Sequence, residues 1–86
     1  YPNPFDSRKT QATIHFTLGQ SADVTLKIYS VFGRLLKDIN RPGISGSNEM
    51  LWDGTDESGR KVGKGLYLGV LESAGSRKTI KIGVIH

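Results

Sequence analysis

The 86-residue chain has no cysteine and only one tryptophan and one methionine. The absence of cysteine excludes a disulfide framework and a cysteine-ligated zinc site, and it removes thiol chemistry. No apolar run approaches the roughly 20 residues that a membrane-spanning helix needs, so we expect no membrane insertion. No basic segment followed by an apolar one opens the chain, so we predict no signal peptide within it.

The basic residues do not form a cluster along the sequence. Basic residues outnumber acidic ones by 12 to 8, which gives a net charge of +4, but no basic run is longer than a pair. Nucleic-acid-binding domains usually cluster their basic residues on one face or one helix. We therefore predict a solubilising surface charge and no nucleic-acid partner.

Catalytic patterns are also missing. His15 and His86 are the only histidines, and His15 has no second histidine or carboxylate at ligand spacing. The chain has no Gly-x-Ser-x-Gly elbow, and the segment 63–65 is too short for a phosphate-binding glycine loop. We predict no enzymatic activity, no catalytic, cofactor-binding or metal-ligating residues, and no cofactor.

An apolar periodicity of two is what the sequence does contain. Apolar and polar residues alternate in 13–18, 24–29 and 79–84, as in antiparallel strands with one buried face. Less regular strands are predicted at 35–39, 49–53 and 66–71, with a short seventh near Val62. Because no segment of ten residues shows a helical stripe and turns follow at short intervals, the pattern predicts a β-sandwich.

Glycine-rich segments connect these strands. The predicted connections are 19–22, the tight hairpin 30–33 with Gly33 at positive φ, the longer crossing loop 41–46, and the hairpin 73–76. The predicted core consists of the apolar residues on the inner faces of the strands: Ile14, Phe16, Leu18, Val24, Leu26, Ile28, Trp52, Leu66, Leu68, Ile80, Ile82 and Val84.

A polar loop follows the only tryptophan and runs as far as Tyr67. It contains the turn dipeptides at 53–54 and 58–59, and aspartate side chains organise such turns by accepting hydrogen bonds from nearby backbone N–H groups. We interpret Trp52 as a core residue and Asp53 as the residue that ties the loop to it. Tyr67 could place its hydroxyl across a corner of the sandwich.

Two functional alternatives remain open for this loop. Asp53, Asp56 and Glu57 carry the hard oxygen ligands of a calcium site, although the EF-hand spacing is absent. Alternatively, Trp52 could form a sugar-binding platform. Away from the loop, Tyr29 is the better candidate for an exposed contact.

The first eleven residues precede the first clear strand. Pro2 and Pro4 restrict their neighbours to extended conformations, so Tyr1 and Phe5 would anchor an extended leader across one end of the sandwich. We interpret residues 1–86 as one domain, the C-terminal part of a longer exported protein.

Several short motifs occur in a specific order along almost the whole chain: Tyr1-Pro2-Asn3-Pro4-Phe5, Val24-x-Leu26-x-Ile28-Tyr29, Phe32-Gly33-Arg34, Trp52-Asp53-Gly54-x-Asp56-x-x-Gly59 and Gly65-x-Tyr67. This set resembles the immunoglobulin-like domain of flagellar hook-capping proteins. It is equally similar to the C-terminal sorting domains of type IX-secreted bacterial proteins.

The resemblance implies an all-β, immunoglobulin-like (fibronectin III-like) antiparallel sandwich of about seven strands. It also implies a non-catalytic accessory domain that acts in sorting, surface attachment or assembly, outside the cell or at its surface. The partners would be the rest of the parent chain or the secretion and cell-surface machinery. The alternatives are a flagellar hook-cap assembly domain and a carbohydrate- or protein-binding module attached to a secreted hydrolase such as a peptidase or glycosidase.

The last strand departs from the sorting-domain pattern because no basic tail follows Lys81. We expect its outer face to consist of Lys78, Thr79, Lys81 and Gly83. A strand with so few bulky outward groups could pair with a partner strand or pack against the preceding domain. Alternatively, Lys78 and Lys81 could be gatekeepers that prevent such pairing.

Overall fold

The computed structural model describes residues 5–6, 8–73 and 75–85. These residues form six strands. The strands are β1 (Ala12–Leu18), β2 (Ala22–Ser30), β3 (Leu35–Gly43), β4 (Gly46–Trp52), β5 (Gly65–Ser73) and β6 (Ser76–Val84). The six strands that the sequence predicts are all present, each within a few residues of its predicted bounds.

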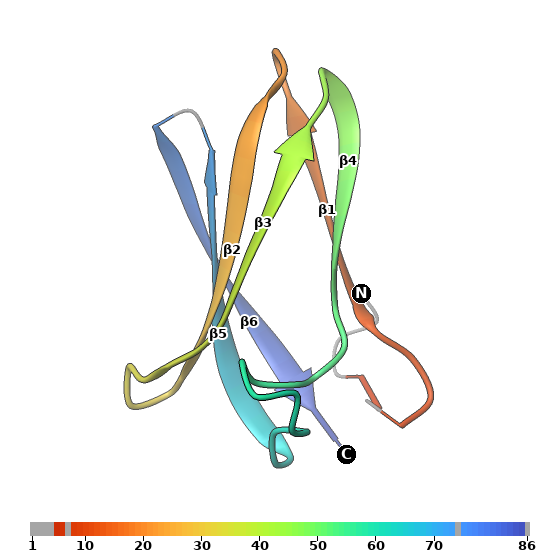
Figure 1. Cartoon of the computed structure of the whole chain (residues 1–86), viewed down its shortest axis with the longest axis vertical. Coiled ribbons are helices and arrows are strands. Elements are labelled where there is room, and N and C mark those ends of the chain that lie inside the picture. Colours follow the sequence, from red (N-terminus) through yellow and green to blue (C-terminus); the bar gives the residue numbers. More distant parts are fainter. Residues whose placement is uncertain (1–4, 7, 74, 86) are drawn as a thin grey trace.

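The strands form two antiparallel sheets (Figure 1). One sheet pairs β1 with β4, and the other has the strand order β3-β2-β5-β6. The chain passes between the sheets after β1, after β3 and after β4, as in sandwich folds. This confirms the predicted all-β, immunoglobulin-like sandwich.

The described residues contain six strands and not seven. Near Val62 the chain makes only an isolated bridge between Thr55 and Lys61, and the leader makes only an isolated parallel bridge between Phe5 and Val84. The N–H groups of Thr55, Ser58 and Arg60 bond to aspartate oxygens within the loop, so they do not lengthen the bridge into a strand.

The core lies between the two sheets. Its most deeply buried large side chains are Trp52, Phe5, Leu26, Ile28 and Val24. Of the other predicted core residues, Ile14, Ile82 and Val84 are buried, and Phe16, Leu18 and Ile80 are partly buried against the core. Phe5 is 1% exposed, which confirms its predicted role as an anchor, whereas Tyr1 lies outside the described residues.

Strand β5 corrects two predicted core residues. Leu66 is 48% exposed, and neither it nor Leu68 belongs to the core cluster. The register places Gly69 opposite Ile28 and Leu71 opposite Leu26, so the inner face of β5 is the odd-numbered one. The segment is apolar on both faces, and alternation alone therefore could not identify the buried face.

The predicted hairpins are correct, and the crossing loop is shorter than expected. Gly33 has a φ of 87° in the turn between β2 and β3, and Gly75 has a φ of 82° in the last hairpin. Strand β3 continues through Gly43, so only residues 44–45 connect it to β4. The Asn48 side chain closes this turn by accepting from the N–H of Ile44 and donating to its carbonyl.

Candidate functional site

Trp52 lies at the end of β4 with its indole in the core. It is 1% exposed, and its ring makes edge-to-face contacts with Phe5 at 5.7 Å and Tyr67 at 5.8 Å between centroids. The indole Nε1 donates a hydrogen bond of 2.9 Å to the carbonyl of Thr55. The core role of Trp52 is confirmed, and a sugar platform on this ring is wrong because no face of the ring is exposed.

Asp53 organises the first turn of the loop. Its Oδ1 accepts hydrogen bonds from the backbone N–H and the hydroxyl of Thr55. The hydroxyl bond holds the pKa of Asp53 below its ordinary value of 3.8, with smaller contributions from the Thr55 N–H and from the charges of Lys37 and Lys61. Asp53 therefore ties the loop to Trp52, as the sequence predicts.

Asp56 and Glu57 bond to other partners. Asp56 Oδ1 accepts from the N–H and hydroxyl of Ser58, and the hydroxyl bond lowers the pKa of this carboxyl. Glu57 reaches the edge of the larger sheet, where its carboxylate accepts a 2.7 Å bond from the N–H of Asp38. No group of three His, Cys, Asp or Glu residues in the described part of the chain is arranged to hold a metal ion, so the geometry gives the calcium alternative no support.

Tyr67 forms the predicted corner bond. Its hydroxyl donates a 2.5 Å hydrogen bond to the carbonyl of Gly63, four residues earlier. Burial raises the pKa of the phenol. Together with the two bonds from Lys37 to Thr55 and the Asp56 carbonyl, this contact makes the loop part of the framework.

The remaining single-residue candidates lie apart from one another. His15 is exposed on β1, 3.7 Å from the carboxylate of Glu49 on β4, and His86 lies outside the described residues. Tyr29 is half-buried on β2, opposite Leu68 of β5. His15 and Tyr29 lie in different sheets and do not form a joint site.

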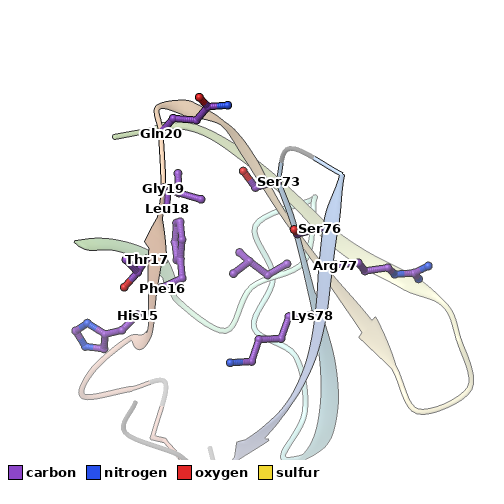
Figure 2. Close-up of a pocket in the computed structure, with 11 residues that line it drawn as sticks. His15, Phe16, Thr17, Leu18, Gly19, Gln20, Ser73, Ser76, Arg77 and Lys78 are labelled. Atoms are coloured by element: carbon purple, nitrogen blue, oxygen red, sulfur yellow. The ribbon is translucent and has the colours of Figure 1, made fainter. Parts of the chain in front are cut away.

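A groove between β1 and β6 is an open feature that sequence reasoning missed. It has a volume of about 660 Å³ and is lined by β1, the turn after β1, and the hairpin between β5 and β6. Figure 2 shows Phe16 and Leu18 directed from β1 toward the gap, and Lys78 directed from β6 toward the same gap. Since β1 and β6 are far apart in sequence, no local motif could indicate it.

Lys78 thus differs from its predicted position. It pairs with Leu71 and lies two residues from Ile80, so it belongs to the inner face of β6 and lines the groove. Thr79, Lys81 and Gly83 form the outer face, as expected, because they pair with Val70, Leu68 and Leu66. Lys78 shares the even-numbered face of Ile80, Ile82 and Val84, so the alternation of β6 itself places it on the inner side.

Comparisons with known proteins identify the family. A family model described as the FlgD Ig-like domain matches residues 3–77. The chain therefore belongs to the FlgD Ig-like domain family, a non-catalytic domain type, and the resemblance stated from the sequence is confirmed. No curated protein matches the chain in sequence.

Solved structures with the same fold come from longer proteins. FlgD from P. aeruginosa is 25% identical with a TM-score of 0.72, and the match covers 94% of this chain and 62% of that one. Dimeric latent PorU from Porphyromonas gingivalis is 30% identical with a TM-score of 0.75, over 98% of this chain and 9% of that one.

A third solved structure, with lower sequence identity, supports similarity of fold only. PorZ, described as an essential bacterial surface component of the type-IX secretion system of Porphyromonas gingivalis, is 24% identical with a TM-score of 0.65, over 100% of this chain and 11% of that one. The chain thus spans 62% or less of each of these proteins. The described residues include no helix with the length and apolar character needed to cross a membrane.

Proposed function

We propose that this chain is an accessory domain of a larger exported bacterial protein, and that it acts in sorting, surface attachment or assembly. The observation that carries the proposal is the contrast between the polar groups of the Trp52 loop and those of the groove. The carboxylates of the Trp52 loop accept hydrogen bonds within the framework, whereas the groove between β1 and β6 stays open. The described residues therefore offer a surface to a partner and no reactive constellation.

The proteins in which this fold occurs support the proposal. PorU and PorZ are much longer than the matched domain, and PorZ is described as a surface component of a secretion system. We place this chain's parent outside the cell or at its surface on that basis. FlgD is no more similar to the chain than PorU is, so the hook-cap alternative has no advantage.

A reporter fusion tests this function. The domain is joined to the C-terminus of a reporter that carries a signal peptide, in a bacterium with a type IX secretion system, and compared with the reporter alone and with a fusion truncated after Gly75. Truncation removes β6 and with it the core residues Ile82 and Val84. We expect the intact fusion at the surface or in the medium and both controls inside the cell. Equal distribution of all three proteins would contradict the proposal.

A further inference from the structure

The edge of β6 that does not pair with β5 is the feature that most clearly points to a partner. Among the described residues, β6 pairs with a full strand, β5, on one side only. On its other side Phe5 already behaves as a short added strand: its N–H donates to the Gly83 carbonyl, and its own carbonyl accepts from the N–H of Ile85. This edge of β6 therefore accepts extended chain.

The backbone N–H and C=O groups of β6 alternate in direction from one residue to the next. Gly83 directs its carbonyl away from β5, so the backbone groups of Arg77 and Thr79 face the same way. These groups lie beside the groove, whose apolar surface comes from Phe16, Leu18 and Leu71. An extended segment placed here would find backbone partners along one side and apolar contacts beneath it.

The polar groups of the groove indicate the charge of the occupant. None of the described residues that line the groove is acidic, and Lys78 is the basic side chain directed into it, whereas Figure 2 shows Arg77 and His15 directed away from the gap. Ser73 also lines the groove, and its buried Oγ has no hydrogen-bond partner among the described residues. Carboxylates on an incoming strand would be attracted to Lys78, and a polar group on the strand could bond to Ser73.

We propose that the groove between β1 and β6 binds an extended acidic segment of a partner protein, which adds as a strand beside Arg77–Thr79. On the face of the segment that points into the groove, apolar residues would pack on Phe16, Leu18 and Leu71, and a carboxylate would lie beside Lys78, which is on the same inner face of β6. This is strand addition to an exposed sheet edge, in which backbone bonds provide affinity and side chains provide specificity. The inference names the partner chemistry of the accessory role and rests on that proposed function.

A second copy of the chain fits the same edge poorly. If β6 paired with β6 of another copy, the pair would bring together the three basic residues Arg77, Lys78 and Lys81 of each strand, and β6 contains no acidic residue to offset them. Like charges placed opposite each other across a strand pair are destabilising. These basic residues would therefore oppose self-pairing and favour an acidic partner.

Peptide binding tests the inference directly. The probe is a synthetic peptide whose groove-facing alternate residues are valine, glutamate and valine and whose other residues are threonine, titrated into the isotope-labelled domain and followed by amide chemical shifts. We expect saturable shifts at Arg77, Thr79 and the β1 residues Phe16 and Leu18, with an affinity that falls as salt is added. The same peptide with lysine in place of the glutamate should not bind.

Two variants locate the site. Lys78→Glu should weaken binding of the glutamate peptide by at least about tenfold, and Lys64→Glu, the same charge change on an exposed loop residue, should leave it unchanged. Thr79→Pro removes an N–H on the open side of β6, a position where proline is tolerated, and should abolish binding. The melting temperature of each variant is measured to confirm that it is folded.

Three results would overturn the inference: no binding of the glutamate peptide, equal binding of the lysine peptide, or self-association through β6 that the glutamate peptide does not reverse. These outcomes are separate from the reporter assay. If the fusion reaches the surface and the peptide fails to bind, the accessory function stands and the partner chemistry is wrong. If the peptide binds and the fusion stays inside the cell, the accessory function is wrong.

Discussion

At the scale of single residues, Trp52 connects the core to the loop. Its ring packs between Phe5 and Tyr67, and its N–H bonds to Thr55. Trp52→Ala would leave a large cavity and an unpaired carbonyl, so we expect a loss of about 3–5 kcal/mol in the free energy of unfolding. Since a domain has only about 5–15 kcal/mol in total, urea unfolding should show a strongly reduced midpoint. A loss below about 1 kcal/mol would mean that the ring does not fill the core.

The carboxylate of Asp53 predicts a response to acid. Its pKa is lowered in the folded state, so the charged carboxylate stabilises the folded domain. This contribution is complete at pH values above the ordinary pKa of 3.8. That contribution is lost as the pH falls through the lower folded-state value. Asp53→Asn should therefore reduce the dependence of the urea midpoint on pH below about 4, while Asp23→Asn, at an exposed position, serves as the control. An unchanged dependence in the Asp53 variant would contradict the assignment.

At the scale of elements, Gly43 marks a close approach where β3 ends. A Cβ atom at this position would meet Leu18 at 2.6 Å, Val24 at 2.8 Å and the backbone carbonyl of Ala22 at 3.0 Å. Gly43→Ala should therefore destabilise the domain by about 1–3 kcal/mol, measured by thermal unfolding. Gly19→Ala is the matched control, because nothing lies within 4 Å of a Cβ there. Equal melting temperatures for the two variants would show that Leu18 and Val24 leave room for a Cβ atom at Gly43.

The element scale also shows what the sequence could predict. Strands β1, β2 and β6 alternate clearly, and their main core residues were predicted correctly. In β5, Leu66, Leu68 and Val70 are as apolar as the inner residues, so the inner face was assigned to the wrong residues. The groove depends on β1 and β6, which only the three-dimensional arrangement brings together, and the loop carboxylates can be assigned to structure or metal binding only once their partners are seen.

At the scale of the whole molecule, we predict that the domain has no catalytic activity. Its acidic loop residues serve as hydrogen-bond acceptors, and its described histidine pairs with Glu49. A panel of peptide, ester and glycoside substrates should give no turnover above the background. Turnover that a single polar substitution abolishes would contradict this prediction.

The central claim is that the domain acts through the surface at the groove and not through the Trp52 loop. The most direct measurement is the fraction of the reporter fusion that reaches the cell surface when Lys78→Glu is compared with Lys64→Glu. Both variants should fold, since both residues are exposed and surface substitutions usually change stability little. We predict that Lys78→Glu reduces the surface fraction strongly and Lys64→Glu does not. Equal surface fractions for the two variants would contradict the account.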